Sequence, residues 1–259
     1  MTSRALTFGS VAAAYERFRP GYPDEVVEHV LAYAARPVAT ALEIGAGTGK
    51  ATRVFASQGV RVTATDPDAA MLAELVKHVP ASVRTVRAAF EELPLTTTYD
   101  LVYAAAALHW TRPEDRWERI AALLEPGGVV ASFGAPRDLA DPVVEESLRA
   151  ARAPWLADDD VPSPDGTPAD SALQWPSTEL ATSALFTDVT QVVLERRTTV
   201  PAREYVGLLS TVSAFLELTP ADREAALDRI LAALPPQVDV VGDIRLHLAR
   251  RTAEPGTST

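Results

Sequence analysis

The sequence predicts an α/β fold with a doubly wound, mostly parallel sheet. Short apolar runs alternate with segments of helical periodicity, which is typical of parallel strands joined by crossover helices. Roughly five such strand–helix repeats follow one another between residues 38 and 134, and a doubly wound sheet is the most economical arrangement for them. A further β-like run near the carboxyl end, DIRLHLARRT, predicts a last strand that is antiparallel.

The strands are predicted where β-branched and aliphatic residues form short runs. The first run, VATALEIG, ends at a glycine, and the second, VRVTATD, ends at a carboxylate. Two runs in the carboxyl-terminal part alternate between apolar and polar residues, which favours strands. The seven predicted strands are residues 38–45, 60–66, 83–89, 99–108, 127–134, 188–200 and 243–252.

Helices are predicted between these strands and near both ends of the chain. Asp68 is a good N-cap for one helix. Thr219-Pro220 is a typical helix start, and Pro235-Pro236 ends that helix. The predicted helices cover most of residues 10–35, then residues 48–57, 68–78, 113–124 and 219–234.

Composition excludes several classes of function. The chain has 259 residues, 47% of them hydrophobic, which is enough for a full core, and no cysteine, so disulfides and thiolate metal sites are absent. The four histidines fall in different predicted elements, so we expect no metal site. A net charge of −11 with scattered basic residues argues against binding to DNA or RNA.

Nothing in the sequence indicates a membrane or an export route. No stretch approaches the roughly 18–20 uninterrupted apolar residues of a membrane helix. The first residues, MTSRALTFGS, lack a basic segment followed by an apolar run, so we expect no signal peptide. We therefore expect a cytoplasmic protein, and the sequence does not predict its oligomeric state.

The turn after the first predicted strand, in ALEIGAGTGKAT, points to a nucleoside ligand with a positive charge. Gly45, Gly47 and Gly49 make a glycine-rich turn, but Lys50 occupies the third glycine position of a dinucleotide-binding pattern. Glu43 precedes the turn and would oppose a pyrophosphate, which needs a helix N-terminus free of negative charge. A ligand with a cationic centre and an ammonium group meets no such opposition.

Asp66, at the end of the second predicted strand, is a candidate for ribose binding. It lies about 20 residues beyond the glycines, where a carboxylate can accept hydrogen bonds from both ribose hydroxyls. Nicotinamide and adenosyl cofactors share this feature, so Asp66 alone does not distinguish between them. Its alternative role is to cap the helix that follows.

Four motifs in order then carry a resemblance to a known family. EIGAGTGK, TDPDAAM, YDLVYAAAALHW and LLEPGGVVASF resemble the successive motifs of class I S-adenosylmethionine-dependent methyltransferases, over roughly residues 8–135. The chain is most similar to the small-molecule group of trans-aconitate and ubiquinone-biosynthesis type. AAYERFRPGYP resembles the cofactor-covering helix of that group. The resemblance implies a Rossmann-like sheet of seven strands, a helical cap, and S-adenosyl-L-methionine as cofactor with S-adenosyl-L-homocysteine as product.

The resemblance also implies roles for individual residues. The glycine turn and Glu43 would meet the methionine portion of the cofactor, and Tyr15 would close over it. Many relatives carry a polar acceptor for the adenine amine at the position of Ala89, so Glu91 or a backbone carbonyl would replace it here. The implied cofactor-binding residues are Tyr15, Arg19, Glu43, Gly45, Ala46, Gly47, Asp66, Pro67, Met71, Ala89, Phe90, Glu91, Ala104 and Ala105.

His109 is the candidate catalytic residue. It follows the fourth predicted strand, at the sheet edge where ligands bind in such folds. With an ordinary pKa near neutrality it can act as a general base toward an alcohol or phenol. The alternative is that His109 seals the cofactor or donates one positioning hydrogen bond, and both roles stay open.

The predicted organisation places a cap after the cofactor-binding core. Trp155, Trp175, Phe186 and Phe215 flank the insertion, either as pocket lining or as packing, and residues 158–171 form an acidic, proline-rich loop. The predicted parts are covering helices at 1–36, the cofactor-binding core at 37–135, the cap at 136–186, completion of the sheet with carboxyl-terminal helices at 187–252, and a disordered tail at 253–259.

The predicted function is methyl transfer to a small-molecule acceptor with an oxygen, nitrogen or carbon nucleophile, without a metal. Two alternatives stay open. One is a homologue that binds the cofactor but does not methylate. The other is a nicotinamide-dependent reductase, against which the missing third glycine and the absence of a Y-x-x-x-K pair both argue.

Overall fold

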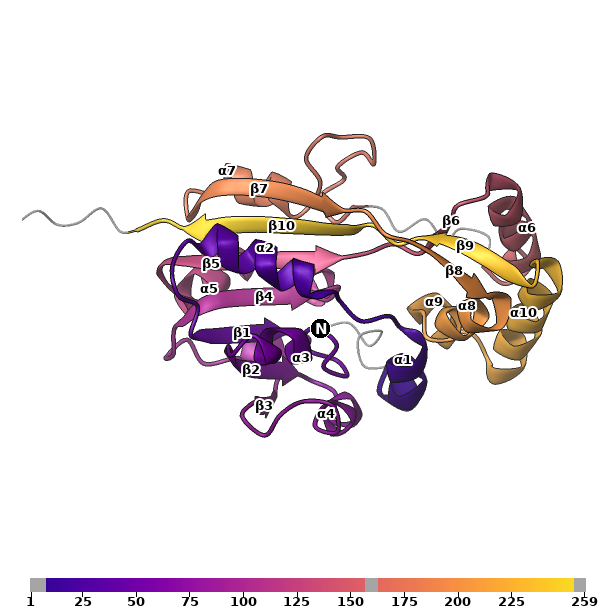
Figure 1. Ribbon diagram of the computed structural model, residues 1–259, viewed down its shortest axis with the longest axis horizontal. Helices are drawn as coiled ribbons and strands as arrows, with labels where there is room; N and C mark the ends of the chain where they lie inside the picture. The colour runs from indigo at the N-terminus through magenta and orange to yellow at the C-terminus, as the bar shows by residue number, and fades with distance from the viewer. Residues whose placement is uncertain (1–7, 157–162, 254–259) are drawn as a thin grey trace, which may run out of the picture.

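The computed structural model describes residues 8–156 and 163–253, and its centre is a seven-stranded sheet (Figure 1). The strand order is β3-β2-β1-β4-β5-β10-β7. Strands β1 to β5 pair in parallel, and β10 lies antiparallel between β5 and β7. The predicted fold class is confirmed. The strands are β1 Thr40–Ile44, β2 Arg61–Asp66, β3 Arg84–Arg87, β4 Tyr99–Ala105, β5 Leu124–Gly134, β7 Phe186–Leu194 and β10 Ile244–Arg251.

Helices cover both faces of this sheet and bury two separate apolar clusters against it. Phe55 lies in the cluster under α2 and α3, and Ile120 lies in the cluster under α5 and α7. The chain order reverses between β1 and β4, and such a switch point opens a crevice at the carboxyl ends of the strands. The elements around the sheet are α2 Asp24–Ala34, α3 Thr52–Ser57, α4 Ala69–Leu75, α5 Arg116–Leu123 and α7 Ser177–Thr182, with the 3₁₀ turns η2 Phe8–Val11, η3 Phe90–Glu92 and η4 Leu108–Trp110.

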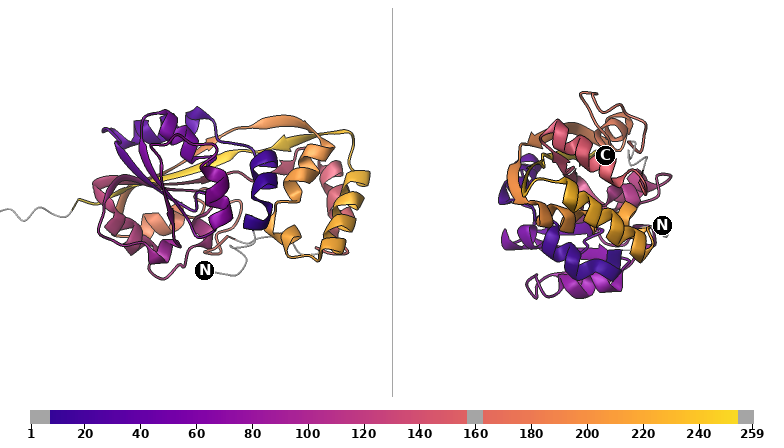
Figure 2. Two further views of the ribbon diagram at one scale, coloured as in Figure 1. Left: turned by 90° about the horizontal axis from the view of Figure 1, so that it is seen from below. Right: turned by 90° about the vertical axis from the view of Figure 1, so that its right-hand side faces the viewer.

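A second, three-stranded sheet forms a cap beside the core (Figures 1 and 2). Its order, β6-β9-β8, repeats the order β5-β10-β7 of the adjoining core strands. Each cap strand is joined to its core partner by a short connection, so the cap sheet continues the core sheet. Helices cover it and bury a third apolar cluster. The cap elements are β6 Asp138–Leu139, β8 Arg197–Pro201, β9 Gln237–Val241, α6 Pro142–Arg152, α8 Ala202–Leu209, α9 Ser213–Leu216 and α10 Pro220–Ala233.

The alternation over residues 188–200 predicts one strand, and the structure corrects this to two strands in different sheets. The break falls at Arg196, whose backbone N–H donates to Asp243 Oδ1 over 2.8 Å. The Gly242 N–H donates to the Arg196 carbonyl over 2.9 Å. These contacts join residues far apart in the sequence, so the local pattern of apolar and polar residues does not reveal the break.

The cap is also divided differently from the predicted segment 136–186. Helix α7 packs against β7 and β10 of the core, whereas residues 197–241 supply most of the cap. Trp175 and Phe186 pack with the core cluster under α7, and Trp155 and Phe215 pack in the cap cluster. These four aromatic residues therefore contribute to packing.

The α1 helix (Ala12–Phe18) lies between the core and the cap (Figures 1 and 2). A Cβ atom at Gly207 of α8 would lie 2.5 Å from the Phe18 ring, so only glycine lets the two helices come this close. Arg17 Nη2 also lies 3.7 Å from Glu204 Oε1 of the cap. The amino-terminal helix thus contacts both parts of the protein.

The predicted helix starts at Asp68 and Thr219 are confirmed. The Asp68 carboxylate accepts from the backbone N–H groups of Ala70 and Met71, and Thr219 Oγ1 accepts from the N–H of Asp222. The predicted helix over 48–57 begins only at Thr52, because residues 45–51 form the turn. No helix within the described ranges is long and apolar enough to cross a membrane. The predictions for residues 1–7, 157–162 and 254–259 lie outside those ranges.

Candidate functional site

The glycine turn after β1 has a backbone that other residues rarely adopt. Gly45 and Gly47 have φ angles of +66° and +55°. A Cβ atom at position 45 would also lie 2.6 Å from the Cβ of Ala107, which follows β4. Gly45 therefore allows the turn to lie directly against the end of the neighbouring strand, at the switch point of the sheet.

Asp66 closes the adjacent side of this crevice. Its Oδ2 accepts from the Gly47 N–H over 2.9 Å, and its Oδ1 accepts from the Asp68 N–H over 2.8 Å. Burial raises the pKa of this carboxyl, and the two backbone N–H groups oppose that shift. The carboxylate is thus held in one orientation, and each of its oxygens can still accept a further hydrogen bond.

Glu43 is buried at the end of β1, with 1% of its surface exposed. Its Oε2 accepts from Thr52 Oγ1 over 2.5 Å and from the Tyr103 hydroxyl over 2.9 Å. The Tyr103 ring is itself stacked on Phe55, with ring centroids 4.2 Å apart. Oε1 is buried and has no hydrogen-bond partner among the described residues. Burial raises the Glu43 pKa to about 8, against the two hydrogen bonds that lower it.

Glu43, which carries the unpartnered oxygen Oε1, lines a small cavity of about 70 Å³, here called the inner cavity. Tyr15, Arg19 and Gly47 line both the inner cavity and a larger one of about 230 Å³, the main cavity. Unsatisfied buried acceptors are costly in proteins. A donor with positive charge, such as an ammonium group, suits this position.

The α1 helix is fixed over the turn by Glu16. Its carboxylate accepts from Thr48 Oγ1 and from Arg53 Nη2, each over 2.7 Å, and lies 3.2 Å from Lys50 Nζ. Burial opposes ionisation of Glu16, but these partners hold its pKa below the ordinary value. Lys50 Nζ also donates to the Glu16 carbonyl over 2.7 Å. Lys50 therefore anchors α1 to the turn.

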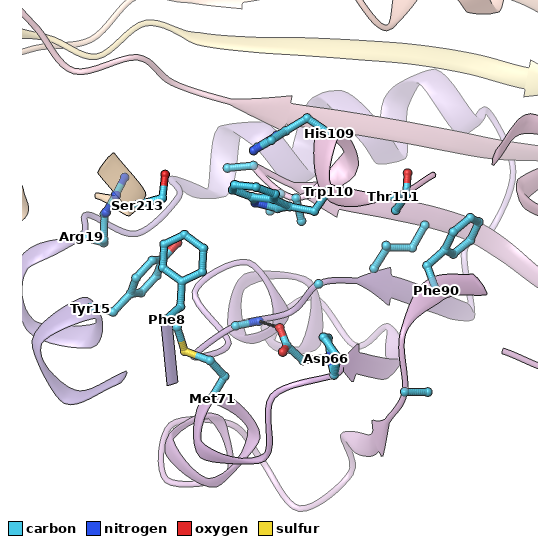
Figure 3. A pocket seen from close by; sticks show the side chains of 18 of the residues that line it. Phe8, Tyr15, Arg19, Asp66, Met71, Phe90, His109, Trp110, Thr111 and Ser213 are labelled. Carbon is cyan, nitrogen blue, oxygen red and sulfur yellow. Dashed lines mark hydrogen bonds between the residues drawn. The ribbon is translucent and has the colours of Figure 1, made fainter. Parts of the chain in front are cut away.

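The main cavity combines core and cap residues (Figure 3). Asp66 and Met71 lie on the opposite side from His109 and Trp110 in this view, and Arg19 and Ser213 lie toward one end. Arg19 Nε donates to Thr211 Oγ1 over 2.8 Å, which ties α1 to the cap. This pocket thus extends from the strand ends of the core to residues of the cap.

Comparisons with known proteins agree with this geometry. The model of a methyltransferase domain family matches residues 42–132. An uncharacterized methyltransferase of Mycobacterium tuberculosis is 41% identical over 52% of this chain and 54% of its own length, and the trans-aconitate 2-methyltransferase of Variovorax paradoxus is 34% identical over 54% and 53%. A solved structure of a candidate type II methyltransferase from Anaeromyxobacter dehalogenans is 25% identical, covers 92% of this chain and 100% of its own, and superposes with a TM-score of 0.65. Residues 42–132 thus match a methyltransferase domain, and the structural match supports the resemblance to class I S-adenosylmethionine-dependent methyltransferases.

The predicted family is thereby confirmed, and with it S-adenosylmethionine as the cofactor. The chain spans about half the length of the sequence relatives that it matches, whereas the structural match extends through the cap. No group of three or more potential ligand side chains is arranged to hold a metal ion in the part of the chain that the structure describes.

His109 lines the main cavity from the 3₁₀ turn after β4. The turn is held by Arg116, which is 2% exposed and donates through Nε to Thr111 Oγ1 over 2.7 Å and through Nη2 to the Thr111 carbonyl over 2.9 Å. Burial, together with the Arg116 cation, lowers the His109 pKa to about 4. The imidazole is therefore neutral at pH 7 and can accept a proton or a hydrogen bond.

The structure gathers most predicted site residues around the two cavities. Ala89 and Ala104 do not line either one, and Ala104 is buried within β4. Glu91 lines the main cavity, although its Oε1 already accepts from the Arg112 N–H over 2.7 Å. The predicted residues that line a cavity are Tyr15, Arg19, Glu43, Gly45, Ala46, Gly47, Asp66, Pro67, Met71, Phe90, Glu91, Ala105 and His109.

Several other lining residues belong to none of the sequence motifs. Val212 and Ser213 come from the cap, and Phe8 precedes α1. Phe8 could have been suspected from its position before the covering helix. Nothing in the local sequence of 212–213 indicates a pocket, because only the fold brings that segment to the core.

Proposed function

We propose that this methyltransferase transfers a methyl group from S-adenosylmethionine to a small-molecule acceptor, without a metal ion. The observation that carries the proposal is the main cavity of about 230 Å³. Motif residues such as Asp66 line one portion, and Val212 and Ser213 of the cap line another. Cofactor and acceptor then share one closed space, as ligand sites between two structural units commonly do.

The chain offers groups that match the different parts of the cofactor. In this proposal Asp66 accepts from the ribose hydroxyls, and Glu43 Oε1 accepts from the ammonium group. Met71 and Phe90 supply apolar surface for the adenine. The buried, unpartnered oxygen of Glu43 is the strongest support for a cationic ligand, because an ammonium group at this oxygen favours the ionised carboxylate, whereas a pyrophosphate disfavours it.

When bound, S-adenosylmethionine supplies a methyl group that its positively charged sulfur already activates. The task of the protein is then to position the acceptor and to exclude water, and positioning alone can lower a barrier by several kcal/mol. Tyr15 and Phe8 meet edge to face, with centroids 6.1 Å apart, and both line the cavity. Glu16 anchors α1 to the glycine turn, and Tyr15 of α1 and Phe8 of the preceding 3₁₀ turn then cover the site.

His109 is the proton acceptor in this proposal. It is neutral at pH 7, because its pKa is about 4. A base of such low pKa is also weak, since the efficiency of proton transfer follows basicity. The site therefore favours an acceptor with an acidic nucleophile over one with an ordinary alcohol.

The acceptor is small in this proposal. The main cavity must also hold most of the cofactor, which leaves limited room under the cap. The name of the related trans-aconitate 2-methyltransferase indicates a small acid as its acceptor. A net charge of −11 argues against a nucleic acid, because phosphates need a compensating basic surface.

Calorimetry and an acceptor screen test the proposal. S-adenosylhomocysteine and S-adenosylmethionine should bind to the wild-type protein, and NADH should not. A screen of carboxylic acids, phenols, amines and carbon acids should then release S-adenosylhomocysteine, detected by mass spectrometry. Binding of NADH in place of the adenosyl ligands would contradict the cofactor site. Binding without release in any acceptor class would instead indicate a homologue that does not methylate.

A further inference from the structure

We propose that the protein has a second ligand site, separate from the cofactor pocket, that binds a small carboxylate with an apolar chain or ring. The site is a cavity of about 260 Å³ at the junction of core and cap, here called the junction cavity. It lies between the α1–α2 connection, which contributes Pro20 and Gly21, and the cap elements β8, β9 and α8.

Two guanidinium groups give the junction cavity a cationic end. Arg137 and Arg196 both line it, and neither pairs with a carboxylate in the described part of the chain. Burial lowers the Arg137 pKa, and the neighbouring cations of Arg19 and Arg196 act in the same direction. In a chain with a net charge of −11, two neighbouring arginines without a counter-ion indicate that an anion is supplied from outside.

The backbone around both arginines is held in place. The Tyr205 hydroxyl donates to the Arg137 carbonyl over 2.9 Å. A Cβ atom at Gly242 would lie 2.3 Å from Arg137 Nη1, so the glycine leaves room for the guanidinium against the backbone. The backbone of Arg196 is bonded to Asp243 and Gly242, as described for the strand break. Such prior ordering reduces the entropy that a ligand must remove on binding.

The rest of the junction cavity is mainly apolar. Its wall includes Phe18, Val200, Leu208, Val240 and Ile244. Glu204 is the one carboxylate among the lining residues, and Arg17 lies 3.7 Å from it. An inorganic anion would use only the arginines, whereas a carboxylate with an apolar body would use both parts of the cavity.

The site is distinct from the cofactor pocket. Arg196 and the apolar wall line neither the main cavity nor the inner cavity. Arg137 and Pro20 line both the inner and the junction cavities and so stand between them. A ligand at the junction therefore does not need the space of the cofactor.

Isothermal titration calorimetry with octanoate tests this site in the full-length protein saturated with S-adenosylhomocysteine. Octanoate should bind saturably with one site, and inorganic phosphate and octanamide should each bind at least about tenfold more weakly, since each lacks one half of the ligand. Arg196→Gln should weaken octanoate binding about tenfold or more and leave the affinity for S-adenosylhomocysteine unchanged. Val200→Thr keeps the shape but makes the wall polar, and it should weaken octanoate several-fold.

The matched control is Arg203→Gln, which removes an exposed arginine of α8 that does not line the cavity. It should bind octanoate like the wild type. If Arg203→Gln and Arg196→Gln weaken octanoate binding equally, the arginines act only through long-range charge and the proposal is overturned. Three other results would also overturn the proposal. Octanoate would fail to bind saturably, phosphate would bind as tightly as octanoate, or S-adenosylhomocysteine would compete fully with octanoate.

Discussion

Glu43 provides a quantitative test of how the cofactor is bound. In the free protein its carboxyl is buried, one oxygen lacks a partner, and its pKa is about 8. An ammonium group placed at this oxygen favours the ionised form, so the pKa falls when the ligand binds. Binding of S-adenosylhomocysteine should therefore release a proton. The neutral isostere Glu43→Gln has no such proton to lose.

The size of the effect follows from the pKa. With a pKa of about 8, Glu43 is almost fully protonated at pH 6.5, so binding should release about one proton per ligand if the carboxyl ionises in the complex. The α-amino group of the ligand remains charged at that pH, so it does not contribute to the proton count. By linkage, the association constant should rise about tenfold from pH 5.5 to pH 6.5. Acid therefore weakens the binding of S-adenosylhomocysteine.

Calorimetry in two buffers of different ionisation enthalpy measures the proton count directly. The wild type should show a buffer-dependent enthalpy at pH 6.5, and Glu43→Gln should show a much smaller one and a flatter pH dependence. Asp66 also has a raised pKa and lies in the same crevice, so the difference between the two proteins is the relevant quantity. Equal proton release by both proteins would refute the role of Glu43.

Three further predictions concern the same pocket. Asp66→Asn should weaken S-adenosylhomocysteine binding about tenfold or more, and it should also lower the melting temperature, because an amide NH2 then faces one of the two backbone N–H groups; unchanged affinity would contradict ribose binding. Gly45→Ala should lower the free energy of unfolding by about 1–3 kcal/mol more than Gly59→Ala. Both glycines have a positive φ, +66° and +82°, but only a Cβ at position 45 would contact Ala107. Equal losses in chemical denaturation would remove the packing argument. His109→Gln should lower kcat by about 10²–10⁴-fold. The wild-type rate should fall as the pH drops to about 4, where His109 becomes protonated. Retained turnover of the variant at every pH would exclude proton transfer by His109.

The cofactor half of the site was predictable because it is local in sequence. The glycine turn and Asp66 each follow a strand directly, and parallel strands bring their carboxyl ends to one edge. Once the strands are recognised, the positions of these residues follow. The sequence also showed that Glu43 sits at the turn, but not that one of its oxygens would be buried without a partner, because that depends on where Thr52 and Tyr103 lie.

The cap could not be predicted in the same way. Its sheet is built from continuations of core strands, and each cap strand follows or precedes its core partner after a connection of only a few residues. Which strand segment belongs to which sheet is decided by contacts between residues far apart, such as Arg196 with Asp243. Periodicity reports which face of a strand is buried, and it carries no information about where one sheet ends and another begins.

The acceptor half of the pocket exists only because α1 contacts the core and the cap together. On one side Glu16 is bonded to Thr48 and Arg53, and on the other side Arg19 is bonded to Thr211. Val212 and Ser213, which follow Thr211 directly, are the cap residues that line the main cavity. A chain that loses the Glu16 contacts would therefore change the cofactor end, and one that loses the Arg19 contact would change the acceptor end. The short helix α1 is the element through which residues of the core and residues of the cap are brought to the same cavity.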